Sequence, residues 1–469
     1  MSGRNVLKLD RDSISKFQKE LYNADKNNPI IGTRFSLDVE KRSQASHMKV
    51  KLDQVPGREG QIVYTASKKF DSLFKLEAHI PLFPIRVKDK YSKSISICYP
   101  HNLGHNILPF GECKIDDEHI EYIDSIWMDI YSQFFVEKRD LYDQMVGNIP
   151  CLEDWSSELP GIPLIVPQPY SFTRKTQVSL PLLKSSGNTV TFEYKIRNKI
   201  TDLIRMRVLK PDGEYKEIKC NLKYLEYKSE TLPVPEMWGR YAEITDEERN
   251  WRKSVDENTG EPTKQIIYIE DLDITCSKNP KTIGTADVIP LESLAPAKHI
   301  FWVASLVDGN FSNYTTNRSN LKLGWNPCAI SGIKYGGSDR VEELGHEHFD
   351  LAECYDFNWP NTPREAGYNV HTYTFNPSNI QHADTAVILK ECGASLNVTL
   401  GDTNPFISSE QEEDHTDENG ELIPIEALEN DDMESSKRDK YNIHVRTLVT
   451  RRMEVYWNDK GGSLKYIFS

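Results

Sequence analysis

Thr189-Val-Thr-Phe-Glu-Tyr-Lys-Ile196 alternates polar and apolar residues along its length. Because successive side chains of a β-strand point to opposite faces, this period of two predicts a strand with one buried face. Further segments predict strands: 61–65, 74–80 and 94–98 before it, and 265–269, 299–304, 370–375 and 396–400 after it. Proline and glycine separate the runs, as at Pro160-Gly161, and predict turns. The sequence therefore predicts an all-β protein, built as sandwiches or jelly rolls.

The chain divides into two strand-rich halves. Its 469 residues are enough for roughly two to four domains. Asp124 can cap one helix in the first half, and Thr245-Asp-Glu-Glu248 has the pattern of a capping box that begins a short charged helix between the halves. We expect an N-terminal arm over 1–29, a first jelly roll over 30–245, a linker helix and loop over 246–261, and a second jelly roll over 262–469 with an acidic insert over 402–440.

Composition excludes several classes of protein. Hydrophobic residues make up 38% of the chain, and no run approaches the roughly 18 apolar residues of a membrane span, so we expect no transmembrane segment. The first residues lack the apolar region of a secretory signal. Eight cysteines without a C-x-x-C pair predict reduced, mostly buried thiols rather than a disulfide framework.

Negative charge is concentrated in one segment. The net charge is −14, and residues 410–439 contribute 13 acidic against 2 basic side chains, which is −11. The remainder carries only −3 and has no basic stripe, so direct binding of nucleic acid is not expected. The acidic segment is expected to be a solvated loop that gives the assembled protein a negative exterior.

An ordered series of short motifs carries a family resemblance. The series in the first half is Asn102-Leu-Gly-His105, the helix around Trp127, Lys138–Asn148, Val166–Arg174 and Leu180–Leu183. In the second half it continues through Arg240–Arg249, Lys298–Val303, Gly337–Arg340, Gly367–Val370 and His382–Asp384. This series resembles the major capsid proteins of nucleocytoplasmic large DNA viruses. The chain departs from the family pattern at Asp116-Asp117, where relatives often have Gly-Gly, and at Leu141, where they often have glycine.

The resemblance implies a fold and a function. It implies two consecutive eight-stranded jelly rolls with short helices in loops, and a structural protein without enzyme activity or cofactor. Three chains would form a homotrimeric, pseudo-hexameric capsomer, and neighbouring capsomers would tile an icosahedral virion shell. Synthesis and assembly would take place in the host cytoplasm. The N-terminal arm would contact minor capsid proteins beneath the shell through Ile14, Phe17 and Leu21, which share one face of a short helical pattern.

The motifs also supply candidate structural residues. These are Asn102, Gly104, His105, Trp127, Tyr142, Asp143, Gly147, Asn148, Pro167, Pro169, Trp302, Gly367 and Tyr368. We expect positive φ at Gly104 and Gly147, and capping of backbone groups by Asn148. Trp127, Trp238 and Trp302 are expected in the core, and the two prolines in a stiff extended stretch between sheets.

Other interpretations remain open. An assembly scaffold or minor capsid homologue would keep the fold, whereas a β-sandwich enzyme or carbohydrate-binding protein would need a pocket with paired carboxylates or an aromatic platform. Cys98, His101 and His105 have ligand-like spacing, as do His346 and His348, but ordinary polar loops are favoured over metal sites. Four sequons are candidate glycosylation sites: Asn310, Asn313, Asn317 and Asn397.

Overall fold

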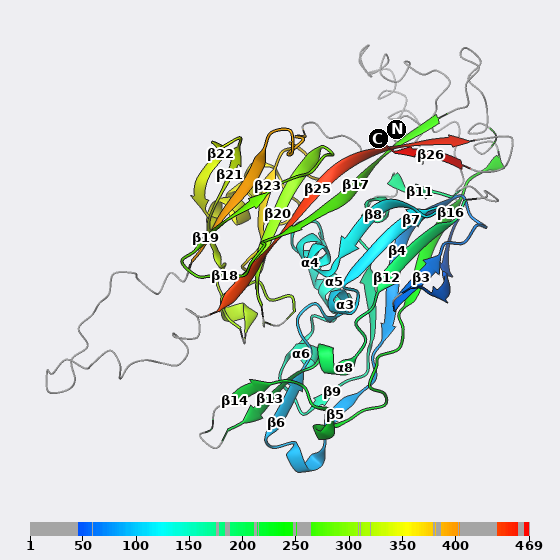
Figure 1. Ribbon diagram of the computed structural model, residues 1–469. Coiled ribbons are helices and arrows are strands. Elements are labelled where there is room, and N and C mark those ends of the chain that lie inside the picture. The colour runs from blue at the N-terminus through cyan, green and yellow to red at the C-terminus, as the bar shows by residue number, and fades with distance from the viewer. Residues whose placement is uncertain are drawn as a thin grey trace, which may run out of the picture.

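The protein is a pair of antiparallel β-sandwiches that stand side by side (Figure 1). The computed structural model describes residues 46–58, 60–174, 178–182, 188–210, 213, 215–246, 250, 264–307, 309, 311–318, 320–378, 380, 386–401, 403, 439–457 and 464–468. The predicted N-terminal arm, most of the linker and most of the acidic insert lie outside these residues. Within the described part of the chain, no helix is long and apolar enough to cross a membrane.

Two five-stranded sheets form the first sandwich. One has the order β1 (Ser46–Lys51), β16 (Glu236–Glu243), β4 (Ser72–Pro81) and β10 (Pro163–Pro167), with β11 (Leu180–Pro181) also paired to β4. The other has the order β2 (Asp53–Pro56), β3 (Gln61–Thr65), β12 (Val190–Lys195), β7 (Phe110–Ile115) and β8 (Glu118–Asp124). The strand with one buried face that the alternation predicts is confirmed in β12, where Val190, Phe192 and Tyr194 are all buried in the core.

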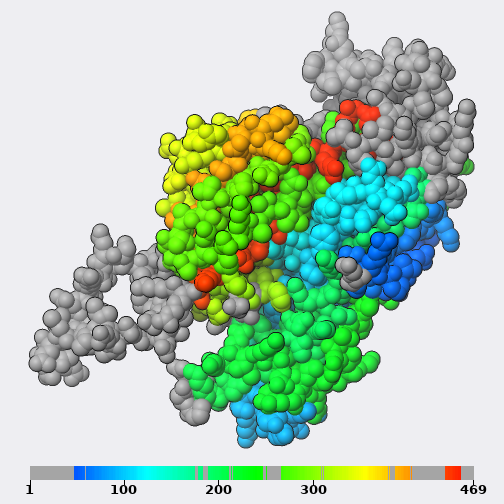
Figure 2. Space-filling model, viewed as in Figure 1, coloured from blue at the N-terminus to red at the C-terminus, as the bar shows by residue number. Residues whose placement is uncertain are grey.

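An extension projects from the first sandwich at one end (Figures 1 and 2). Its two small sheets are β14 (Tyr215–Ile218), β13 (Arg205–Leu209) and β6 (Ile95–Cys98), and β15 (Leu225–Glu226), β5 (Ile85–Val87) and β9 (Glu158–Leu159). Short helices accompany them: η1 (Asp89–Tyr91), α6 (Pro150–Glu153), α8 (Ile200–Leu203) and η3 (Leu222–Tyr224). The predicted strand 94–98 therefore belongs to this extension rather than to the sandwich.

The second sandwich pairs a six-stranded with a four-stranded sheet. The first has the order β17 (Lys264–Cys276), β25 (Lys440–Trp457), β20 (Ala297–Leu306) and β23 (Asn369–Thr372), with β18 (Lys281–Thr282) and β26 (Leu464–Phe468) paired to β25. The second has the order β19 (Ala286–Pro290), β24 (Ala394–Leu400), β21 (Cys328–Tyr335) and β22 (Ser338–Gly345). The described residues of this half also form the short helices η4 (Leu321–Leu323), η5 (His348–Ala352) and α10 (Glu353–Asp356).

The described residues form more strands than the expected eight per roll. In each half the two principal sheets together hold ten described strands, among them two-residue strands such as β11 and β18. The turn Asp116-Asp117 between β7 and β8 has φ values of 50° and 68°. Aspartate tolerates this left-handed conformation better than most residues, which explains how the chain makes the turn without glycine.

Candidate functional site at the junction of the two halves

Helix α4 (Ser125–Phe134) joins the two halves through an aromatic cluster. Asp124 caps the helix, as predicted, by accepting a hydrogen bond from the backbone N–H of Trp127 at 2.7 Å. The Trp127 ring meets Phe301 of β20 edge to face, with ring centres 5.6 Å apart. Phe134 lies 5.3 Å from Phe301 and 5.4 Å from Trp359 of the second half. The halves therefore share one continuous apolar core.

Strand β20 is buried on both faces, which explains why its sequence does not alternate. Ile300 and Trp302 point into the core of the second sandwich, where the Trp302 indole N–H donates to Ser331 Oγ at 3.2 Å. Phe301 and Val303 point the other way, into the core that includes the first half. A strand covered on both sides is apolar throughout, as parallel-sheet strands are.

Buried ion pairs cross the same junction. Arg446 of β25 contacts Asp124 through Nη2 at 2.5 Å and Nε at 3.0 Å, and its side chain is only 3% exposed. Glu270 of β17 pairs with Lys298 of β20 and, at 2.6 Å, with Arg174. Burial alone would raise the pKa of Glu270, but the Lys298 and Arg174 charges outweigh burial and hold that pKa below its ordinary value. The Glu270 carboxylate therefore stays ionised in the interior.

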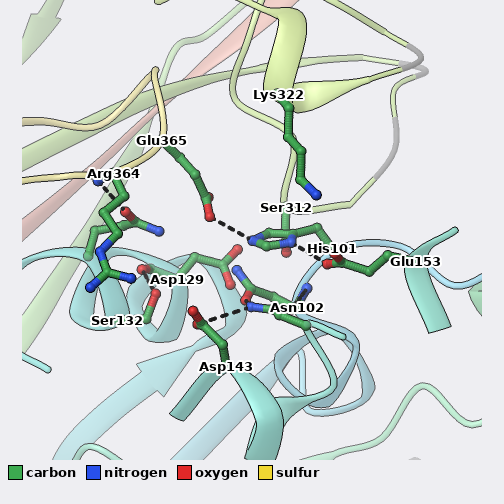
Figure 3. A network of polar contacts seen from close by, with 12 residues as sticks. His101, Asn102, Asp129, Ser132, Asp143, Glu153, Ser312, Lys322, Arg364 and Glu365 are labelled. Carbon is green, nitrogen blue, oxygen red and sulfur yellow. Dashed lines mark hydrogen bonds and ion pairs between the residues drawn. The ribbon is translucent and has the colours of Figure 1, made fainter. Parts of the chain in front are cut away.

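His101 bridges carboxylates from the two halves (Figure 3). Its Nδ1 lies 2.6 Å from Glu153 of α6, and its Nε2 lies 3.1 Å from Glu365 of the second half. Burial lowers the pKa of His101, but the charges and hydrogen bonds of Glu365 and Glu153 raise it well above the ordinary value. The imidazolium therefore holds together two groups that would otherwise repel each other.

A second histidine, His105, contacts Asp129, which lies in the middle of α4. Nδ1 of His105, on α3 (Leu103–Ile107), lies 2.6 Å from Asp129 Oδ1, and its Nε2 lies 2.9 Å from the hydroxyl of Tyr142. Tyr142 belongs to α5 (Arg139–Val146). The Tyr314 hydroxyl of the second half donates to the other Asp129 oxygen at 2.8 Å. Asp129 thus connects three segments that are distant in the sequence.

Asn102 and Asn148 form a reciprocal amide contact beside this network. The backbone N–H of Asn102 donates to Asn148 Oδ1 at 2.7 Å, and Asn148 Nδ2 donates to Asn102 Oδ1 at 2.6 Å. The backbone N–H of Asn148 donates to the Asp143 carbonyl at 2.8 Å. Gly147 has φ of 100°, whereas the prediction of positive φ at Gly104 is wrong, because Gly104 lies within α3 and the left-handed residue is Asn102 at 52°. Gly104 is needed for close packing, since a Cβ there would lie 2.5 Å from Val166.

Gly367 and Tyr368 complete the junction from the second half. Gly367 has φ of 99°, and a Cβ on it would collide with the Tyr314 carbonyl oxygen. Tyr368 is buried, with its ring centre 5.3 Å from that of Tyr314. Many of the motif residues that carry the resemblance therefore converge on this junction, although they are spread over more than 260 positions from Asn102 to Tyr368.

Other candidate residues lie elsewhere. Pro167 ends β10 and Pro169 is buried just beyond it. Trp302 is in the second core, but Trp238 is only partly buried, so its prediction as a core residue is wrong. Trp238 occupies an outward position of β16, where its indole N–H contacts Glu236 at 3.3 Å. Ile14, Phe17, Leu21 and Asn310 lie outside the described residues.

The remaining sequons differ in accessibility. Asn313 is buried, and its amide donates to the Asn317 carbonyl at 2.8 Å and accepts from the Thr315 backbone at 3.1 Å. Asn317 is half-buried, and Asn397 is half-buried in the middle of β24. Attachment to Asn313 would require its hydrogen bonds to break.

Cys98, His101 and His105, which have ligand-like spacing in the sequence, do not form a common metal site in the structure. Cys98 is buried on β6, where burial raises the pKa of its thiol to about 12, and both histidine rings face carboxylates. Over the described ranges, no group of three or more histidine, cysteine, aspartate or glutamate side chains is arranged to hold a metal ion.

Sequence reasoning missed several junction residues, among them Asp129, Glu270, Glu365 and Arg446. A signal for a buried partner such as Glu270 was present. Lys298 lies close to the apolar run from Ile300 to Ala304, and a charge in such surroundings is buried only with a partner.

Comparisons with known proteins agree with this architecture. The family described as "Major capsid protein N-terminus" matches residues 80–242. The major capsid protein of Lymphocystis disease virus 1 is 25% identical over 320 residues, covering 64% of this chain and 67% of that protein. The major capsid protein of Simulium iridescent virus is 21% identical over 412 residues, covering 80% and 82%.

Solved structures have the same fold. The PBCV-1 virus capsid matches with a TM-score of 0.62 at 14% identity, covering 92% of this chain and 98% of that chain. The Faustovirus major capsid protein matches with a TM-score of 0.60 at 8% identity, covering 88% and 91%. The two sandwiches are the predicted double jelly roll, and the chain is similar in sequence to the major capsid proteins of nucleocytoplasmic large DNA viruses.

Proposed function

We propose that three copies of this chain form a homotrimeric, pseudo-hexameric capsomer, and that many such capsomers tile an icosahedral shell. The observation that carries the proposal is the junction, which holds two similar sandwiches in one chain as a single block. Three such blocks around a three-fold axis place six similar sandwiches in a ring, and cyclic symmetry closes the assembly.

Rigidity of the block is what this function needs. A capsomer must present the same outline to every neighbour, so its two sandwiches cannot rotate against each other. Contacts between domains that are small and polar permit relative motion, whereas large apolar contacts oppose it. The shared aromatic core belongs to the second kind, and the buried ion pairs Asp124–Arg446 and Glu270–Arg174 join the two halves beside it.

Exposed apolar side chains on the second half support self-association. Tyr355 of α10 is 84% exposed, and Leu351, one helical turn earlier, is 54% exposed. Phe375 is 71% exposed and its ring centre lies 6.4 Å from that of Phe357, which follows α10. Clustered exposed apolar residues mark contact surfaces, so we assign this patch to a contact between copies.

The finer organisation follows from the same proposal. We divide the chain into the arm 1–29, the first roll 30–245, the linker 246–261 and the second roll 262–469. The arm would meet minor capsid proteins beneath the shell. Synthesis and capsomer assembly would take place in the host cytoplasm.

The solution mass of the purified protein tests the proposal. Three chains of 54.0 kDa give 162 kDa, which light scattering distinguishes from a monomer. Tyr355→Ser combined with Phe375→Ser should shift the mass toward 54.0 kDa, whereas Tyr215→Ser in the extension should not. A wild-type monomer under assembly conditions would contradict the proposal. Abundance in purified virions separates a capsid protein from a scaffold, because a scaffold leaves the particle.

A further inference from the structure

The far end of the extension carries a positively charged surface in a negatively charged protein. It consists of Lys88, Lys90, Lys93 and Lys223, here called the lysine tip, on and beside η1 and η3. Residues 86–93 and 219–228 together contain seven basic and two acidic side chains, a net charge of +5 in a chain of −14. The tip lies at the end of the extension remote from both sandwiches, where Figure 1 shows a blue helical turn below β6.

Backbone and ring contacts hold the tip in a defined shape. The Lys88 backbone N–H donates to the Tyr224 carbonyl at 2.9 Å, and Lys88 Nζ donates to the Lys223 carbonyl at 2.8 Å. Tyr91 and Tyr224 meet edge to face at an interplanar angle of 87°, with ring centres 5.0 Å apart. Lys90 Nζ lies 4.6 Å from the centre of the Tyr91 ring, and Lys223 Nζ lies 4.6 Å from the centre of the Tyr224 ring. The two turns are therefore fixed against each other.

Within the described ranges, no carboxylate forms an ion pair with the lysine tip. The adjacent Arg86, by contrast, is paired with Glu226 at 2.6 Å. Lys90, Lys93 and Lys223 are exposed. A hydrogen bond from Lys90 lowers the pKa of Tyr91, and the charges of Lys90, Lys223 and Lys88 act in the same direction. The ammonium groups of the tip repel one another, so a bound anion would reduce this electrostatic repulsion.

We propose that the lysine tip binds an anionic polysaccharide through its sulfate or carboxylate groups. Several exposed ammonium groups in one small area suit a polymer that carries closely spaced anions. Binding of single-stranded nucleic acid uses open aromatic faces for stacking of bases. Each tyrosine here already has an ammonium group over its ring and the other ring beside it, which favours recognition by charge alone. The proposal concerns the extension and does not depend on the trimer.

The test measures binding of defined polymers to the full-length protein at fixed ionic strength. The probes are heparin as the sulfated polymer, polygalacturonate as the carboxylated one, neutral dextran, and duplex DNA. The variant Lys90→Gln, Lys93→Gln, Lys223→Gln removes three charges from the tip. Its matched control is Lys138→Gln, Lys278→Gln, Lys390→Gln, which removes three charges from exposed lysines elsewhere. Light scattering on each variant records the oligomeric mass separately.

We expect the wild-type protein to bind heparin, polygalacturonate or both, and not dextran, with affinity that falls as salt is added. The tip variant should bind about tenfold more weakly, as expected for three exposed charge contacts acting together, and the control should bind as the wild type does. Equal losses in both variants, or no binding of either acidic polysaccharide, would overturn the proposal. Binding of DNA as tight as that of the polysaccharides would overturn the assignment of the ligand class.

Discussion

Replacing Arg446 with methionine should weaken the junction more than any exposed ion pair can. The substitution keeps most of the side-chain volume. Among the described residues, it leaves the buried Asp124 carboxylate with the Trp127 backbone N–H as its remaining partner. Removing one member of a buried pair costs about 3–5 kcal/mol, because the other charge loses its compensation. A domain is stable by only about 5–15 kcal/mol, so the loss is a large part of the total.

The control for this variant is Arg364→Met. Arg364 also pairs across the junction, with Asp140 at 2.8 Å, but the two side chains are 60% and 83% exposed. Exposed pairs of this kind contribute between 0 and about 1 kcal/mol. The double variant Asp124→Asn, Arg446→Met removes both charges and should recover part of the loss.

Urea-induced unfolding followed by tryptophan fluorescence measures these differences, because Trp127 and Trp359 lie within the junction. The reasoning predicts a much lower midpoint for Arg446→Met and a nearly unchanged one for Arg364→Met. Equal midpoints for the two single variants would show that the buried pair does not stabilise the junction, and would refute the argument.

Three further predictions concern single residues. Folding raises the pKa of His101, so protonation of this residue stabilises the folded protein. This stabilisation is complete below the ordinary histidine pKa of about 6.5 and is lost as the pH rises through the raised pKa. The thermal midpoints of the wild type and of His101→Gln should therefore converge at alkaline pH. Parallel midpoints over that range would contradict this. Gly367→Ala should destabilise by roughly 1–3 kcal/mol in chemical unfolding, since its φ is 99° and its surroundings are full, whereas Gly336→Ala, in open space, should cost less. Trp302→Ala should cost roughly 3–5 kcal/mol and the partly exposed Trp238→Ala clearly less, and similar values for the two would remove Trp302 from the core.

Local patterns were sufficient to predict the class of fold. The alternation in β12 and the cap at Asp124 depend on neighbours in sequence, so both could be identified without tertiary information. The extension could not be separated from the first sandwich in this way, since β6 alternates like any strand. Only its pairing with β13, whose other edge pairs with β14, places it in a separate sheet.

The junction shows where sequence reasoning reaches its limit. His105 and Asn148 belong to recognisable motifs, but their partners Asp129 and Asn102 are brought to them by the packing of α3, α4 and α5. Tryptophan is usually a core residue, but Trp238 lies on the outward face of β16, because the register of the strand decides which side chains are buried. Gly104 looked like a turn residue and instead permits a close helix contact.

The central claim is that the rigid two-sandwich chain is one third of a capsomer. Electron cryo-microscopy of the purified protein, analysed as class averages viewed along the particle axis, tests this most directly. The account predicts three-fold particles whose base shows six similar lobes, two from each chain. Particles with two lobes and the mass of one 54.0 kDa chain would contradict it.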